Sequence, residues 1–116
     1  MVLYHCMIEL KNDARALAFA SAAENWLGHL KTKGLIGDWQ LYRRKLGLGS
    51  EAHGDFMLQI QVKSLSHLDT AFQSLMQDDD TDPRNYELMH EMIGSVQTGL
   101  YRPYPDEKQR ERIALI

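Results

Sequence analysis

The sequence contains a single cysteine, Cys6, and no apolar run that approaches the roughly 18 residues typical of a membrane-spanning helix. One cysteine cannot form a disulfide within the chain, and it excludes the zinc sites built from several cysteines. The opening segment MVLYHCMIELKND lacks the cationic start and the small-residue cleavage site of a signal peptide. We therefore expect a protein of the reducing cytoplasm that has no membrane partner.

The sequence also lacks an excess of positive charge. Its 13 Lys and Arg residues are outnumbered by 16 Asp and Glu residues, which gives a net charge of -3. Because binding to a phosphate backbone needs a cationic surface, we expect no nucleic-acid partner. The length of 116 residues fits one globular domain, which we place at residues 1–104, followed by a C-terminal tail at 105–116.

Hydrophobic residues alternate with a period of two in several segments and recur at helical spacing in others. The alternation predicts strands over residues 2–10, 36–46, 55–62 and 95–102. Helical spacing predicts a first helix from Asn12 or Asp13, either of which can cap it, to about Lys33. Further helices are expected from Ser64 or Ser66 to Gln77 and from Asp82 to Ile93.

This order of elements predicts an α+β, ferredoxin-like βαββαβ fold, with a four-stranded antiparallel sheet and helices on one face. The opposite face, which we call the open face, is then expected to carry a mixture of sulfur, aromatic and amide side chains. That mixture suits an interface or a pocket better than open solvent. The residues expected there are His5, Met7, Met57, Gln59, Gln97 and Tyr101.

Three segments carry a resemblance to a known superfamily: the opening strand VLYHCMIEL, the passage LQIQVKSLSHLDTAFQSL, and the final strand that leads into the tail. Over residues 1–104 the chain resembles the dimeric α+β barrel superfamily, and within it an uncharacterised branch. The resemblance implies a homodimer in which two ferredoxin-like subunits pair through their open faces. It also implies that a small molecule is held between sheet and helices, as in cofactor-independent monooxygenases, small isomerases and stress-responsive relatives.

A candidate ligand site lies beside the first strand, between the open face and the loop from Gly47 to Gly54, whose glycines allow the loop to open. His5 offers a hydrogen-bond donor or a general base, although a histidine here can equally be satisfied by a backbone carbonyl or by a dimer partner. Arg43 and Arg44 face opposite sides of a strand, so one of them can grip a carboxylate, unless both are solvated. The side chains expected to line the site are His5, Glu9, Tyr42, Arg44, Gln59 and Tyr101.

Two further features are interpreted as structural. Glu87 and His90 have the Glu-x-x-His spacing of di-iron bundles, but that motif must occur twice and here occurs once. Cys6 has no cationic neighbour in the pattern that would stabilise a thiolate, so we interpret it as buried and unreactive. We expect no metal site and no cofactor.

The sequence leaves the function open between different classes. The favoured hypothesis is a homodimeric binding protein for an amphipathic carboxylic acid such as a fatty acid, with the tail along Met7 and Met57 and the carboxylate at Arg44. The alternative is a cofactor-independent monooxygenase or isomerase, in which His5, Tyr42 and Tyr101 position a small aromatic or keto substrate. A homodimer with a purely structural role is the third possibility.

Overall fold

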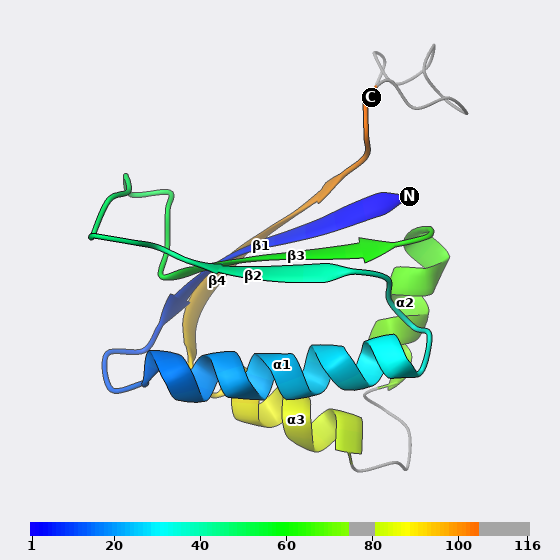
Figure 1. The fold of residues 1–116 in the computed structure, drawn as a ribbon, viewed down its shortest axis with the longest axis horizontal. Coiled ribbons are helices and arrows are strands. Elements are labelled where there is room, and N and C mark those ends of the chain that lie inside the picture. The colour runs from blue at the N-terminus through cyan, green and yellow to red at the C-terminus, as the bar shows by residue number, and fades with distance from the viewer. Residues whose placement is uncertain (75–80, 105–116) are drawn as a thin grey trace.

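The computed structural model of the protein describes residues 1–74 and 81–104. The four strands form one antiparallel sheet in the order β2-β3-β1-β4, and the helices lie on one side of it (Figure 1). This is the expected ferredoxin-like α+β fold. In chain order the elements are β1 (Val2–Leu10), α1 (Ala16–Thr32), β2 (Trp39–Arg43), β3 (Phe56–Val62), α2 (Leu65–Gln73), α3 (Thr81–His90) and β4 (Ile93–Tyr101).

The first helix begins later than the sequence predicts. Arg15, an extended residue with φ -96° and ψ 131°, stands at the N-cap, and no side chain caps the helix. The predicted cap at Asn12 or Asp13 is therefore wrong. Instead, a backbone turn occupies these residues, in which the Ala14 N–H donates to the Lys11 carbonyl at 3.0 Å. At the other end, Gly34 adopts a φ of 75°, a left-handed conformation that glycine adopts readily and that commonly ends a helix.

Two other boundaries differ from the predictions. β2 is only five residues long, because the flanking chain bonds to β3 outside the regular ladder, through Gly37 on one side and Arg44 on the other. Ile93 was expected on the third helix but is the first residue of β4, where it pairs with Leu10. The predicted end of the second helix at Gln77 and the tail at 105–116 lie outside the described residues.

The core lies between the sheet and the helices. Phe19 from α1 is fully buried, and its ring centroid lies 4.9 Å from that of Phe56 on β3. The apolar stripe predicted for the first helix is confirmed, because Phe19, Ala23, Leu27 and Leu30 are all buried. The strands contribute their alternate residues from the other side: Val2, Cys6, Ile8, Phe56, Leu58, Ile60 and Val62.

The strand register determines which side chains share a face. His5 pairs with Gln59 on one side and Gly99 on the other, whereas Met7 pairs with Met57 and Gln97. Since Cβ atoms alternate along a strand and paired residues point the same way, these side chains all lie on the face opposite the core. The register therefore confirms that the residues expected on the open face share one face.

Candidate functional site

The centre of the open face is an aromatic and amide cluster around His5. The His5 ring contacts Tyr101 edge to face, with ring centroids 6.0 Å apart and an interplanar angle of 86°. Tyr101 reaches this position across Gly99, where an added Cβ would lie 3.2 Å from the tyrosine ring. The glycine that weakens the β4 pattern thus makes room for the tyrosine beside His5.

The structure distributes the six predicted site residues over two places. Register and alternation put His5, Glu9, Gln59, Tyr42 and Tyr101 on the open face. Arg44 lies just beyond β2, where its Nη1 donates to the His53 carbonyl at 2.8 Å and its Nη2 lies 3.7 Å from Asp55 Oδ1. Asp55 also accepts the Leu10 N–H at 2.9 Å, so Arg44 and Asp55 together hold the base of the 44–55 loop. That all six residues line one pocket stays a prediction.

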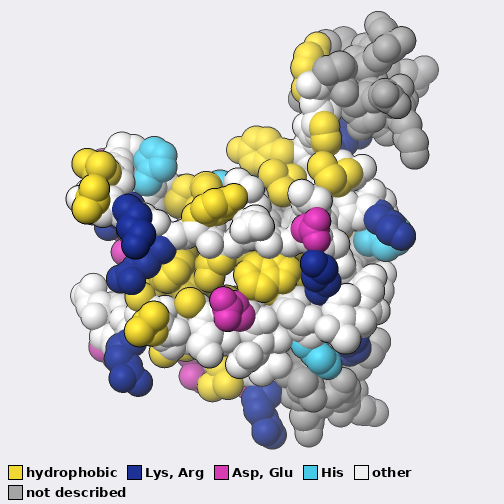
Figure 2. Space-filling model, viewed as in Figure 1, with side chains coloured by type: hydrophobic (Ala, Val, Ile, Leu, Met, Phe, Trp, Pro, Cys, Tyr) yellow, Lys and Arg dark blue, Asp and Glu magenta, His cyan; other side chains and the backbone are white. Residues whose placement is uncertain are grey.

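A cleft lies on the other side of the sheet, between helix α1 and edge strand β2. It consists of two adjoining cavities of about 450 Å³ and 430 Å³ that share Ala16, Arg43 and Phe56 as lining residues. We call it the α1–β2 cleft. Figure 2 shows hydrophobic side chains gathered between β2 and α1, with basic side chains near the end where β2 leaves the sheet. Its lining includes Ala16, Ala20, Trp39, Leu41, Arg43 and Phe56.

The cleft exists because small residues of α1 stand opposite large residues of β2. Trp39, Leu41 and Arg43 point toward the helix side, since they pair in register with the inward-facing Ile60, Leu58 and Phe56. The helix lines this stretch with the small side chains of Ala16 and Ala20, and with Leu17 and Glu24. Trp39 and Leu41 consequently remain half-buried, and a cavity with both apolar and polar lining stays open along the edge strand.

The charges of the cleft are concentrated at one end. Arg43 lines both cavities and Glu24 lines only the other one, whereas Lys11, Asn12 and Asp55 line this end. Arg44 lines it too, but its guanidinium is engaged by His53 and Asp55. Within residues 1–74 and 81–104, the Arg43 guanidinium has no hydrogen-bond or ion-pair partner. A cleft with apolar side chains such as Trp39 and Leu41 beside such a guanidinium can hold a chain or ring that carries a carboxylate.

The sequence contained a signal for this arrangement. The inward-facing positions of β2 read Trp, Leu, Arg, so a cation follows two apolar residues beside β3, whose inward-facing residues are all apolar. That Arg43 and Arg44 face opposite sides of the strand was predicted from alternation. The choice of Arg44 as the ligand-facing residue rested on the open face, whereas the cleft is on the side of Arg43.

A cluster of weak acids lies deeper in the core, on the helix side of β1. Burial raises the pKa of Tyr4 to about 12 and that of Cys6 to about 11, and burial also raises the pKa of Tyr86 on α3. The Trp26 ring, which is 4% exposed, lies 4.9 Å from the Tyr86 ring. Its Nε1 has no acceptor among the described residues. The prediction that Cys6 is buried is confirmed.

The described part of the chain, residues 1–74 and 81–104, contains neither a metal-binding cluster nor a membrane-spanning helix. No group of three or more His, Cys, Asp or Glu side chains in this part is arranged to hold a metal ion. None of its helices is both long and apolar enough to span a membrane.

Several solved structures share this fold. The protein At3g17210 from Arabidopsis thaliana has a TM-score of 0.71 at 6% identity, over 92% of this chain and 99% of that one. A dimeric ferredoxin-like protein of unknown function from Bacteroides fragilis has a TM-score of 0.62 at 10% identity, over 88% and 95%. SnoaB from Streptomyces nogalater, a cofactor-independent oxygenase, has a TM-score of 0.66 at 9% identity, over 91% and 95%. At these identities the likeness concerns the fold.

The sequence comparisons are more specific than the structural ones. No curated protein gives a significant match to this chain. A family described as being of unknown function, DUF6614, matches residues 1–116. The chain therefore belongs to the DUF6614 family, a family of unknown function, and it has the ferredoxin-like fold.

Proposed function

We propose that this protein binds a small amphipathic carboxylic acid, such as a fatty acid, in the α1–β2 cleft. The observation that carries the proposal is the position of Arg43. Arg43 lines both cavities, on the inward-facing side of β2 next to Leu41, and its guanidinium has no carboxylate partner in the described chain. A ligand carboxylate would supply that partner.

The apolar part of the ligand would lie along Trp39 and Leu41, against the alanine surface of α1. Burying these half-exposed side chains contributes roughly 25 cal/mol for each Å² of apolar surface removed from water. The carboxylate would accept two parallel hydrogen bonds from Arg43, and hydrogen bonds to charged groups contribute about 1.5–3 kcal/mol each. Lys11 and Asn12 at the same end add further donors.

The ligand carboxylate, which the sequence assigns to Arg44, is better placed at Arg43. Arg44 already donates to the His53 carbonyl and lies beside Asp55, so a ligand would have to compete with both groups. Arg43 has no such competitor among the residues described. Met7 and Met57, the earlier candidates for contact with the tail, lie on the opposite face of the sheet.

A homodimer formed through the open faces is the second part of the proposal. The open face carries Met7, Met57 and His5, all half-buried, and the exposed ring of Tyr101, a mixture that isolated monomers seldom leave uncovered. The dimeric ferredoxin-like protein from Bacteroides fragilis supports this assembly. The loop between β2 and β3 rises on the same side as the open face and would flank the partner (Figure 1).

The dimer can be tested with a charge placed at the centre of the open face. Light scattering coupled to size exclusion should give twice 13.4 kDa for the wild type and 13.4 kDa for Met7→Glu, because two carboxylates would be buried together. The matched control is Leu65→Glu, which puts the same charge on an exposed leucine of α2. A monomeric wild type, or dissociation by both variants alike, would contradict the open-face dimer.

The alternative hypothesis, a cofactor-independent monooxygenase or isomerase, receives support from the fold shared with SnoaB. The residues assigned to that chemistry do not serve the cleft, however, because His5, Tyr42 and Tyr101 lie on the opposite face of the sheet. The binding hypothesis is therefore the better supported of the two. Oxygen consumption on addition of an aromatic or keto substrate would instead favour the monooxygenase hypothesis over the binding hypothesis.

The binding proposal can be tested by fluorescence, because Trp39 lines the cleft while Trp26 is buried in the core. In a Trp26→Phe background, decanoate should change the Trp39 emission saturably, and decanol should bind at least tenfold more weakly. Arg43→Met should remove this preference, whereas the control Arg84→Met, on α3, should preserve it. Equal affinity for the acid and the alcohol in the wild type would overturn the assignment of Arg43.

A further inference from the structure

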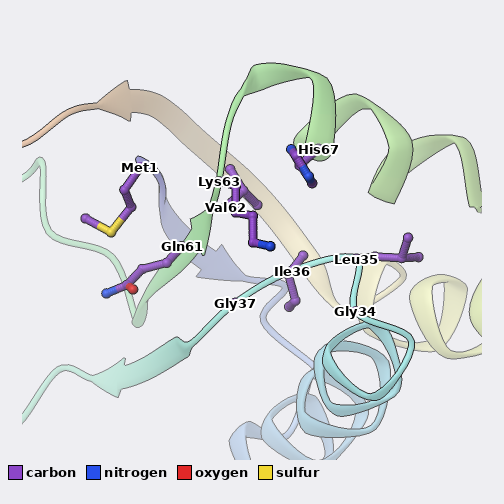
Figure 3. A pocket seen from close by; sticks show the side chains of 9 residues that line it. All are labelled: Met1, Gly34, Leu35, Ile36, Gly37, Gln61, Val62, Lys63 and His67. Atoms are coloured by element: carbon purple, nitrogen blue, oxygen red, sulfur yellow. The ribbon is translucent and has the colours of Figure 1, made fainter. Parts of the chain in front are cut away.

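A third cavity lies beyond the C-terminal end of α1, whereas the α1–β2 cleft lies along the N-terminal half of this helix. It has a volume of about 270 Å³ and lies between the segment that follows α1, the end of β3 and the start of α2 (Figure 3). Ile36 and Val62, both buried, form part of its apolar lining. Lys63, which directly follows β3, and His67 from α2 point toward this space. Among the described residues, its lining includes no Asp or Glu.

The wall of this cavity is held in place by backbone hydrogen bonds. The Gly37 N–H donates to the Gln61 carbonyl at 2.7 Å, and the Gln61 N–H donates to the Asp38 carbonyl at 2.8 Å. A side chain at position 37 would crowd this contact, since an added Cβ would lie 3.1 Å from the Gln61 oxygen. The cavity is therefore formed before any ligand arrives, which lowers the entropic cost of binding.

The polar groups at the rim have unused capacity for hydrogen bonds. The Nδ1 of His67 lies 2.7 Å from Ser64 Oγ, which fixes the ring and leaves Nε2 for another partner. Across the described chain, neither His67 Nε2 nor the Lys63 ammonium has a hydrogen-bond or ion-pair partner. Asp38, the acid next to Gly37 in the chain, is bound to Lys31 at 2.9 Å and does not neutralise them.

We infer that this cavity binds a small organic anion, with its apolar body against Ile36 and Val62 and its carboxylate or phosphate held by Lys63 and His67. An oxyanion can accept hydrogen bonds from both side chains, and the positive end of the α2 dipole, capped by Ser64, favours the same charge. The site is separate from the α1–β2 cleft, whose helical wall is Ala16, Leu17, Ala20 and Glu24.

The chain offers an internal control. Ser50 and His53 repeat the arrangement of Ser64 and His67, with Ser50 Oγ 2.8 Å from His53 Nδ1, but they lie in the loop between β2 and β3, away from this cavity. If Ser64 and His67 only cap a helix, the two histidines will respond alike to anions. If the cavity binds an anion, only His67 will respond saturably.

The experiment is an NMR titration that follows the imidazole C–H signals of both histidines with phenyl phosphate, benzoate and inorganic phosphate. We expect saturable shifts of His67 with phenyl phosphate or benzoate. The compound that binds more tightly shows whether the site prefers a phosphate or a carboxylate. Lys63→Met should weaken this binding at least tenfold, whereas Lys45→Met, in the loop, should not. Arg43→Met should leave this titration unchanged. A negative result for the cavity can therefore be distinguished from a negative result for ligand binding in the α1–β2 cleft.

Three results would overturn the inference. The first is a parallel, unsaturated drift of His67 and His53, which would mean general ionic effects. The second is unaltered binding in Lys63→Met. The third is inorganic phosphate that binds as tightly as phenyl phosphate and benzoate, because the apolar lining would then contribute nothing.

Discussion

The two faces of the sheet are built from the same alternating strands, yet they differ in how polar and apolar side chains are arranged on them. On the helix side the residues of β1 and β3 are buried or half-buried apolar side chains, whereas the edge strands carry the polar residues Arg43 and Thr98, of which Arg43 lines a cleft. On the open face, polar and apolar groups alternate without a break, from His5 to Met7 and from Gln59 to Met57. The difference suggests that a ligand site is marked by a polar residue that interrupts an apolar row, whereas an evenly mixed face is typical of an interface.

The largest expected effect is a difference in the free energy of unfolding between substitutions on the two faces of the sheet. Phe19→Ala removes a fully buried ring that packs on Phe56, and the resulting cavity should lower the free energy of unfolding by about 3–5 kcal/mol. Gln97→Ala, at an exposed position of the open face, should change it by less than about 0.5 kcal/mol. Urea denaturation at one protein concentration measures both. Comparable losses would show that the open face contributes to the core.

A smaller effect is expected where the loop beside the open face is anchored to β1. At Gly54 an added Cβ would lie 2.5 Å from the Ile8 carbonyl oxygen, so Gly54→Ala must displace backbone and should cost about 1–3 kcal/mol. Gly28, inside α1, has open space around it, and Gly28→Ala should raise stability by about 0.5–1 kcal/mol. Thermal unfolding of both variants is the measurement, and stabilisation by Gly54→Ala would contradict this anchoring.

The effect that is absent at neutral pH is a dependence of stability on alkaline pH, and it belongs to the helix side. Burial raises the pKa of Cys6 from 9.0 to about 11, so between these values the unfolded chain loses the thiol proton while the folded chain retains it. Stability should therefore fall as pH rises above about 9, by up to about 1.4 kcal/mol per pH unit for this proton. Tyr4, with its pKa raised to about 12, extends the fall to higher pH.

The contribution of the thiol can be isolated with Cys6→Ala. This variant should show a shallower loss of stability between pH 9 and pH 11 in urea denaturation series, whatever its stability at neutral pH. An unchanged slope would mean that the thiol keeps its ordinary pKa in the folded protein. A thiol reagent should likewise react with native protein far more slowly than with unfolded protein.

The parts of the fold that the sequence predicts well are those with a local period. β1 was expected at residues 2–10 and is found at Val2–Leu10, and the shared face of His5, Gln59 and Tyr101 follows from alternation and strand order. The start of α1 was misplaced because a backbone turn, Lys11 to Ala14, competes with the capping that Asn12 and Asp13 could supply.

The α1–β2 cleft could not be predicted in the same way, because it depends on which residues of separate elements meet. Ala20 of α1 and Leu41 of β2 give no local sign that they lie opposite each other. The cavity beside Lys63 and His67 likewise joins two elements to the segment that follows α1. Such sites arise from tertiary packing, which one sequence read by periodicity does not specify.

The most direct test of the central claim is methyl NMR, with decanoate added to protein labelled at alanine and methionine methyl groups. The account predicts saturable shifts of the Ala16 and Ala20 methyls, which line the α1–β2 cleft, while Met7 and Met57 on the opposite face stay unchanged. In Arg43→Met the alanine shifts should require at least tenfold more ligand. Saturable shifts of Met7 and Met57 with silent alanines would place the ligand on the open face and contradict the account.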